Sequence, residues 1–307
     1  MNPVAAGVHL IDLHHGGHPA VIAAAVVELE AGIALVDPGP GSTLDALEVG
    51  LNEAGLALDD IRTILLTHVH LDHAGATGAI LARHPHIEVL VHERGAPHLV
   101  DPSRLLRSAQ RLFGDRMDQL WGPCLPVPSD RVRPLEGGEA RLLGGRFATR
   151  YTPGHASHHI AYLHEPTGVA LVGDAAGCRI RGAPEVIPAC PPPDIDLDLL
   201  RQSLHAIAAW KPTRLLLTHF GTADGVAEHV AAFERSLEDW AGQVRRSLAD
   251  PGDDAARAAA FALHVGSRLR HSLAPELVGA YERGAPPHMS WFGLARYWRT
   301  RGTDSTR

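Results

Sequence analysis

The 307-residue sequence has little cysteine and no long apolar run. Its three cysteines, Cys124, Cys178 and Cys190, lie far apart and form no CxxC pair. An odd number of cysteines at wide spacing argues against a disulfide framework and is typical of a reducing compartment, so we expect a cytoplasmic protein. Because no apolar run approaches ~18 residues and residues 1–7 lack the basic segment of a signal peptide, we expect no association with a membrane.

Positive charge is also scarce, and Lys211 is the only lysine. The 28 basic and 35 acidic residues give a net charge of −7 when histidine is neutral. A chain with this balance binds the phosphate backbone of nucleic acids poorly, so we expect no nucleic acid partner. Hydrophobic residues at 45% and charged residues at 21% are typical of a globular protein. The one excess is histidine, whose 21 residues are about three times an average share.

Strand-like and helix-like patterns alternate along the first three quarters of the chain. In the first part, the patterns predict strands at 21–30 and 33–36, a helix at 44–54, a strand at 63–66, a helix at 74–83 and a strand at 88–92. Further on, they predict short strands within 131–151, strands at 159–163, 169–172 and 214–218, and a helix at 197–210. This succession of strand, helix and strand indicates an α/β fold.

Two segments are helical in pattern and leave their roles open. Residues 97–128 contain a helical stretch with four arginines: Arg104, Arg107, Arg111 and Arg116. They either face an anionic substrate or form a solvated helix face, and we favour the solvated face. From residue 224 onward the chain is helical, and we expect the last nine residues, 299–307, to fray. Within 281–298, four of the five aromatic residues either line an apolar pocket or a dimer interface, or pack in the core: Trp291, Phe292, Tyr297 and Trp298.

The histidines gather most densely in one motif directly after the predicted strand at 63–66. The motif holds His68, His70, Asp72 and His73 within six residues. Alternate residues at a strand end share one face, and Asp72 is expected to cap the helix that follows. Three imidazoles and a carboxylate so close together are costly to leave unpaired, and they match the ligand preferences of zinc and neighbouring metals.

Three further predicted strands end in a residue of the same kind. His155 follows the strand that ends near Tyr151, Asp174 ends the strand at 169–172, and His219 ends the strand at 214–218. In α/β layers, functional groups collect at the carboxyl ends of strands. The sequence therefore predicts one site that combines all four strand ends.

The HxHxDH motif at 68–73, followed by His155, Asp174 and His219, resembles the metallo-β-lactamase superfamily over about residues 8–235. The resemblance implies a four-layer αβ/βα sandwich with a two-metal site at one edge. It implies a catalytic domain over residues 1–235, in which 97–128 forms a helical insertion or lid. Residues 236–307 would then form a C-terminal helical extension packed on the same domain.

The family pattern also implies a role for each residue of the constellation. One divalent metal would be held by His68, His70 and His155, and the other by Asp72, His73 and His219, with Asp174 as a bridging ligand. Asp72 would in addition be the catalytic residue that orients a metal-bridging hydroxide. We expect zinc at both positions, with iron or manganese as alternatives.

Two more residues match the family near the site. Asp37 matches an early aspartate that usually supports the ligands, although it can equally cap its own turn. His159 matches a histidine of glyoxalase II-like members, although it can equally be a hydrogen-bonded core residue. The segments around His155 and Asp174 make the glyoxalase II-like hydrolases the nearest branch by motif.

The predicted function is hydrolysis of an ester-type bond in a small molecule, with a thioester favoured. The chain shows no GxSxG, GxxxxGK[ST] or GxGxxG motif that would indicate another mechanism. The alternatives are a lactone or phosphoester hydrolase on the same site, a mononuclear iron enzyme of the persulfide dioxygenase type, and a binding protein with a structural metal. No substrate-binding residue is assigned from the sequence, and a homodimer is left open.

Overall fold

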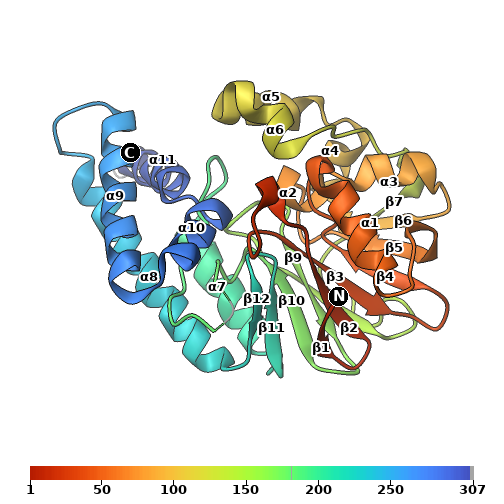
Figure 1. The fold of residues 1–307 in the computed structure, drawn as a ribbon. Helices are drawn as coiled ribbons and strands as arrows, with labels where there is room; N and C mark the ends of the chain where they lie inside the picture. Colours follow the sequence, from red (N-terminus) through yellow and green to blue (C-terminus); the bar gives the residue numbers. More distant parts are fainter. Residues whose placement is uncertain (181, 305–307) are drawn as a thin grey trace.

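A computed structural model describes residues 1–180 and 182–304, with the backbone alone for 302–304, and shows two mixed β-sheets (Figure 1). The first sheet contains, in spatial order, β1 (Asn2–Ala5), β2 (Val8–Asp12), β3 (Ala23–Glu28), β4 (Ile33–Val36), β5 (Ile61–Leu65), β6 (Glu88–His92) and β7 (Val132–Leu135). The second contains, in spatial order, β12 (Gly221–Ala223), β11 (Arg214–Leu217), β10 (Val169–Gly173), β9 (Ile160–His164) and β8 (Phe147–Tyr151).

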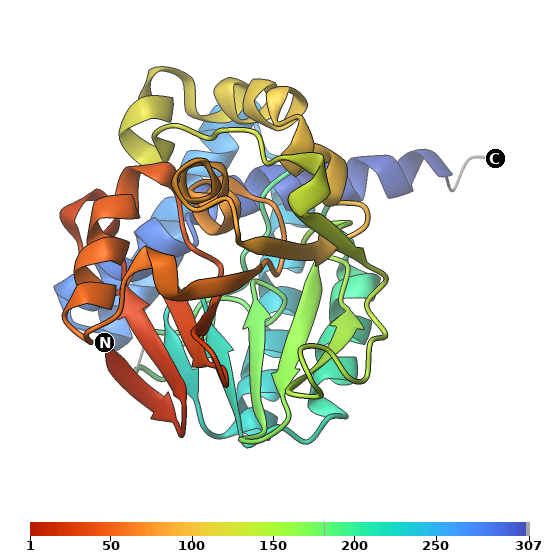
Figure 2. The same cartoon turned by 90° about the vertical axis from the view of Figure 1, so that its right-hand side faces the viewer.

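Helices cover the outer face of each sheet, which gives the four layers that the sequence predicts (Figures 1 and 2). The first sheet is covered by α1 (Leu44–Asn52) and α3 (Thr77–Arg83). The second is covered by α7 (Leu197–Ala208) and α8 (Val226–Ser247). The fold is therefore an αβ/βα sandwich with additional helices at its C-terminal end.

Strand β4 shows how the sequence builds these layers. All four of its residues are buried, which is typical of a strand covered on both faces. Ile33 and Leu35 belong to the apolar cluster shared with α1 and α3, whereas Ala34 and Val36 belong to the cluster between the sheets. The assignment of alternate residues to the two clusters follows from the alternation of side chains along a strand.

The carboxyl ends of four strands meet at one edge of the sandwich. Strand β4 is parallel to β5, and β10 is parallel to β11. Strand β8 runs in the direction of β10 because both are antiparallel to β9. Two backbone hydrogen bonds join the sheets at this edge: the amide of Ala23 donates to Thr218 O at 3.0 Å, and that of Ile160 donates to Thr67 O at 2.8 Å.

The insertion at 97–128 lies over this edge as three short helices, α4 (Ala96–Val100), α5 (Ser103–Phe113) and α6 (Met117–Trp121) (Figure 1). Its far end is fixed on the loop before α1, because the hydroxyl of Ser42 donates to Leu120 O at 2.7 Å. A Cβ at Gly122, whose φ is 62°, would lie 2.6 Å from the amide nitrogen of Ser42, so this close approach requires glycine. We call α5 and α6 the lid.

The C-terminal helices α9 (Asp254–Ser272), α10 (Pro275–Gly284) and α11 (Pro287–Asp304) pack on α8 and on the second sheet. The hydroxyl of Tyr281 on α10 donates to Glu185 O at 2.5 Å. Helix α8 runs through residue 235 without interruption, and the predicted division there stays a prediction. No helix among the described residues has the length and hydropathy needed to span a membrane.

Three local predictions need correction. Strands β1 and β2 were not predicted, and the helix predicted at 74–83 is divided into α2 (Leu71–Ala74) and α3. The fraying predicted for 299–307 is wrong as far as Asp304, because α11 continues and both guanidinium nitrogens Nη1 and Nη2 of Arg299 lie 2.7 Å from the carboxylate of Asp254. Residues 305–307 lie outside the described residues.

A buried histidine on α8 makes the stability of this fold sensitive to acid. Nε2 of His229 donates to Ala176 O at 2.9 Å, and burial lowers the pKa of His229 to about 4. Below pH 6.5 the imidazole of His229 binds a proton in the unfolded chain but not in the folded chain. The free energy of unfolding therefore decreases as the pH falls towards 4. We predict that His229→Gln, which keeps the donor but does not titrate, reduces this loss by up to about 3 kcal/mol. Urea unfolding between pH 7 and 4 measures it, with the exposed His264→Gln as control; equal pH slopes in both variants would contradict the assignment.

Candidate metal centre

Three imidazoles form the first group of converging donor atoms. Nδ1 of His70 lies 2.9 Å from Nε2 of His68 and 3.1 Å from Nε2 of His155. His68 and His70 follow β5, and His155 follows β8, so the two sheets contribute to the same point. His68 and His155 are both buried.

Asp72, His73 and His219 form the second group, whose ligand atoms lie within 4.8 Å of one another. Oδ2 of Asp72 lies 3.3 Å from Nε2 of His219 and 3.8 Å from Nε2 of His73. Asp72 does not cap a helix, as the sequence suggested; the cap position of α2 is His70, and Asp72 lies in the first turn. This position turns its carboxylate towards His219 instead of towards the backbone.

The carboxylate of Asp174 lies between the two groups. Its Oδ2 is 3.4 Å from Nε2 of His155, whereas its Oδ1 is 3.3 Å from Nε2 of His73 and 3.6 Å from Nε2 of His219. One oxygen therefore faces the first group and the other faces the second. The seven residues that the sequence placed together are together in the structure.

The other nitrogen of each imidazole shows which way its lone pair points. Nδ1 of His155 lies 2.9 Å from Ala189 O, and Nδ1 of His219 lies 2.7 Å from Val21 O. A carbonyl only accepts hydrogen bonds, so each Nδ1 carries the proton and each Nε2 presents a lone pair to the centre. Partners of this kind fix the tautomer and the ring orientation of metal-binding histidines.

Asp37 fixes the ring orientation of two more ligands, His73 directly and His68 through Thr67. Its Oδ2 accepts hydrogen bonds from Nδ1 of His73 at 2.8 Å and from the hydroxyl of Thr67 at 2.7 Å. The Thr67 oxygen then lies 3.1 Å from Nδ1 of His68 as an acceptor. Asp37 has a φ of 50°, a left-handed conformation that costs energy outside glycine and is typical of functional positions.

His159 contacts the centre through its second nitrogen. Its Nε2 accepts a hydrogen bond from the amide of Asp174 at 3.3 Å, and its Nδ1 lies 2.8 Å from the hydroxyl of Thr152. Gly173 makes this contact possible: its φ is 48°, and a Cβ would lie 2.5 Å from the Thr67 hydroxyl and 2.7 Å from Nε2 of His159. His159 is thus a hydrogen-bonded core histidine that also positions Asp174.

The donor set fits a pair of cations. Among the described residues, three fully buried atoms of the centre have no hydrogen-bond partner: Nε2 of His73, Oδ1 of Asp174 and Nε2 of His219. An unpaired buried polar atom costs about 1–3 kcal/mol, and these three converge on one another. Nitrogen and oxygen donors in this arrangement match zinc, iron and manganese.

The electrostatics of the two groups differ. Burial and the neighbouring imidazole of His155 lower the pKa of His70 to about 4, and burial also lowers the pKa of His68 and of His155, so the first group is neutral at pH 7. Burial would also lower the pKa of His73, but the nearby carboxylates, with Asp174 first, raise it well above its ordinary value. The second group therefore attracts positive charge even without a metal.

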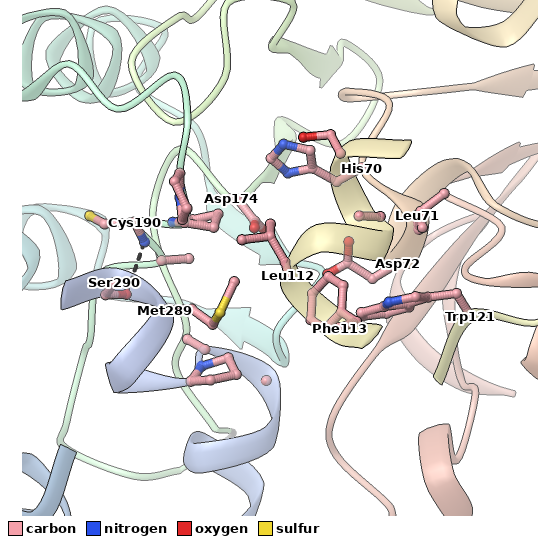
Figure 3. Close-up of a pocket in the computed structure, with 18 of the residues that line it drawn as sticks. His70, Leu71, Asp72, Leu112, Phe113, Trp121, Asp174, Cys190, Met289 and Ser290 are labelled. Carbon is pink, nitrogen blue, oxygen red and sulfur yellow. Dashed lines mark hydrogen bonds between the residues drawn. The ribbon is translucent and has the colours of Figure 1, made fainter. Parts of the chain in front are cut away.

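A cavity of about 160 Å³ opens directly above the centre (Figure 3). Its floor contains His70, Asp72 and Asp174. The lid supplies one wall, with Leu105, Leu112, Phe113 and Trp121, and the other wall comes from 189–193 and from the residues around the α10–α11 junction, including Met289. Figure 3 shows the lid and α11 on opposite sides of the opening.

The structure narrows the open alternatives for the two helical segments, and the dimer interface stays a prediction. The four lid arginines are exposed and do not line the cavity. Trp291 and Tyr297 are buried in the core, and none of the four tail aromatics lines the cavity. Cys178 is a fully buried side chain.

Sequence reasoning missed part of the surroundings. His15 is buried with its ring 5.5 Å from that of Trp121, and its pKa is lowered by burial against an opposing effect of Asp72. Cys190 and Met289 line the cavity, although neither lies in a motif. The excess of histidine over the whole chain was the only signal, and it pointed to no particular residue.

Comparison with known proteins gives the family. The profile of the metallo-beta-lactamase superfamily matches residues 19–219. The chain is 34% identical over 168 residues to the metallo-beta-lactamase fold-containing protein ST1585 of Sulfurisphaera tokodaii, which covers 53% of this chain and 62% of that protein. It is 31% identical over 145 residues to the hydroxyacylglutathione hydrolase GloC of Haemophilus influenzae, covering 47% of this chain and 61% of the relative. The chain thus matches less than two thirds of the length of these relatives.

Solved structures share the architecture over more of the chain. The crystal structure of ST1585 superposes with a TM-score of 0.61 at 25% identity, covering 92% of this chain and 99% of that one. TTHA1429 from Thermus thermophilus superposes with a TM-score of 0.72 at 23% identity, covering 98% and 95%, which shows the shared fold. TTHA1623 in a di-iron-bound form has a TM-score of 0.50 at 26% identity, covering 69% and 94%.

The contact between Asp37 and His73 leads to a prediction about metal affinity. We predict that Asp37→Asn weakens metal binding about 10- to 100-fold, because Nδ1 of His73 loses its carboxylate partner. Asparagine tolerates the left-handed backbone at this position, so the fold is retained. Zinc titration with a competing chelator measures the effect, with the exposed Asp45→Asn on α1 as control. Wild-type affinity in a folded Asp37→Asn protein would contradict the role of Asp37.

Proposed function

The chain belongs to the metallo-β-lactamase superfamily, and we propose that it is a hydrolase with two divalent metal ions at this centre. The observation that carries the proposal is the position of Asp174. Its two oxygens face two separate groups of donors, within 3.4 Å on one side and within 3.6 Å on the other. A carboxylate between two such groups is the arrangement of a bridging ligand in a two-metal site.

Each donor has one task in this proposal. His68, His70 and His155 hold the first ion, and a second set holds the other: Asp72, His73 and His219. Zinc is the metal we favour, because imidazole and carboxylate without thiolate suit it well. Iron is the second choice, since the related TTHA1623 was solved in a di-iron-bound form and the same donors suit iron.

Two divalent ions in such a site lower the pKa of a bound water to about 7 and polarise the oxygen of a carbonyl group. Asp72 then positions the attacking water. Its side chain lines the cavity floor and is 22% exposed, whereas Asp174 is nearly covered. Burial would raise the pKa of Asp72, but the neighbouring imidazoles of His73 and His219 hold it well below its usual range, so the carboxylate stays ionised and can accept a hydrogen bond from a water.

A thioester is the bond we favour. The relatives of this chain include several hydroxyacylglutathione hydrolases, one of them 31% identical over the matched part. In the reaction the water oxygen bonds to the acyl carbon, the carbon–sulfur bond breaks, and a proton passes to the thiolate. Nothing is oxidised or reduced, so the chain needs no further co-reactant. Lactone and phosphoester hydrolysis on the same centre are the alternatives.

Removal of the bridging carboxylate tests the proposal. We predict that Asp174→Ala lowers the metal content from about two ions per chain to one or fewer and reduces thioester hydrolysis about 100-fold or more. Elemental analysis of protein purified without added metal, combined with assays on thioester, lactone and phosphodiester substrates, measures both effects. The exposed Asp130→Ala is the control.

The outcomes separate the candidate functions. Two ions with chelator-sensitive hydrolysis support the proposal, and the preferred substrate of the panel decides the bond. One iron per chain with consumption of oxygen would indicate the persulfide dioxygenase type instead. An Asp174→Ala protein with two ions and full activity would show that Asp174 does not bridge.

A further inference from the structure

The cavity above the centre is apolar apart from its floor, one cation and two serines, Ser108 and Ser290. The lid contributes Leu105, Leu112, Phe113 and Trp121, and the opposite wall contributes Met289 and three consecutive prolines at 191–193. Ser290 also lines the wall, but its hydroxyl is engaged: it accepts a hydrogen bond from the amide of Cys190 at 3.1 Å, as Figure 3 shows. A polar substrate group would find few partners on these walls.

The size of the cavity limits what fits there. Its volume of about 160 Å³ is close to that of the apolar cavity of ~150 Å³ that binds benzene. One aromatic ring or a chain of about six carbon atoms therefore fills it. Because the metal-binding floor lies at the same cavity, the reacting carbonyl group can lie on the floor while the carbon chain lies against the lid.

Arg283 is the one charged residue of the lining outside the proposed centre. It is exposed, it lies at the end of α10, and it forms no ion pair within the described part of the chain. Its neighbour Gly284 packs beside the centre, since a Cβ there would lie 3.6 Å from Cβ of His219. Arg283 thus lines the cavity without an ion pair, and its guanidinium lies back along α10, where a Cβ at Gly279 would be 3.0 Å from its Nη1, so it has to turn towards the opening to reach a ligand there.

We propose that the substrate is an amphipathic anion, a thioester with an apolar acyl group of about six carbon atoms and an anionic thiol part. The acyl group lies between the lid and α11, and the anionic group pairs with Arg283 at the opening. This inference rests on the proposed function for the bond that is broken. It adds the chemistry on either side of that bond, which the lid and the C-terminal helices determine.

The acyl side is tested with thioesters of a neutral thiol, N-acetylcysteamine, from acetyl to decanoyl. Each added methylene group that is buried improves binding several-fold, so kcat/KM rises about 100-fold from acetyl to hexanoyl and falls at decanoyl. Leu112→Trp, which fills the cavity from the lid, moves the optimum to shorter chains. Arg111→Trp adds the same residue on the exposed face of α5 and leaves the optimum unchanged.

The anionic side is tested with hexanoyl thioesters of 3-mercaptopropionate and of N-acetylcysteamine. The wild-type protein prefers the anionic thioester, and Arg283→Gln reduces this preference about two- to fivefold, as expected for a partly exposed ion pair. Arg111→Gln, on the lid surface, leaves the preference unchanged. Metal content is the same in all of these variants, because neither arginine contacts the centre.

A binding measurement separates this inference from the proposed function. Calorimetric titration with hexanesulfonate shows binding to the wild-type protein and weaker binding to Arg283→Gln and Leu112→Trp, whereas methanesulfonate and hexanol bind poorly. Hydrolysis of acetyl and hexanoyl thioesters at equal rates would overturn the inference and leave the hydrolase intact. Hexanesulfonate binding without hydrolysis of any thioester would overturn the proposed function and support the pocket for an apolar anion. If the protein showed no hexanesulfonate binding and no chain-length dependence, the inference would be overturned and the proposed function would stand.

Discussion

The interaction on which this structure depends is the convergence of buried lone pairs at one edge of the sandwich. Five imidazole nitrogens and the oxygens of two carboxylates face one another, and three of these atoms have no hydrogen-bond partner in the described chain. Acceptor atoms at these distances repel one another unless a proton or a metal ion lies between them, and burial strengthens the repulsion. Only positive charge between them makes the arrangement favourable, which is why a metal centre explains it better than packing does.

The surrounding fold holds the donors in these positions. The hydrogen bonds from the amides of Ala23 and Ile160 fasten the two sheets to each other beside the donors. Carbonyl groups fix the rings of His155 and His219 from behind, and Asp37 fixes that of His73. The unfavourable left-handed backbone at Asp37 persists because its carboxylate makes these contacts. Rigid ligands of this kind bind metal with little loss of conformational entropy.

The sequence was sufficient to predict the donor residues of the centre, but it was not sufficient to predict the walls of the cavity. Each donor follows an apolar strand, so its place at the sheet edge could be derived from strand direction alone. Asp37 and His159 could be named, but only the structure shows that they contact His73 and the amide of Asp174. The cavity walls could not be derived, because residues 105–121 and 283–290 meet only through the packing of helices that carry no motif. Asp72 was misjudged as a cap because its contact with His219 is a tertiary one.

The metal centre and the cavity come from different parts of the molecule. The sandwich edge supplies the chemistry, and the lid and C-terminal helices supply the apolar walls and Arg283.

Anomalous diffraction from crystals of the purified protein, recorded across the zinc and iron absorption edges, tests the central claim most directly. The account predicts two peaks about 3.5–4 Å apart, one on each side of Asp174. A single peak, or no peak with the imidazoles pointing apart, would contradict it.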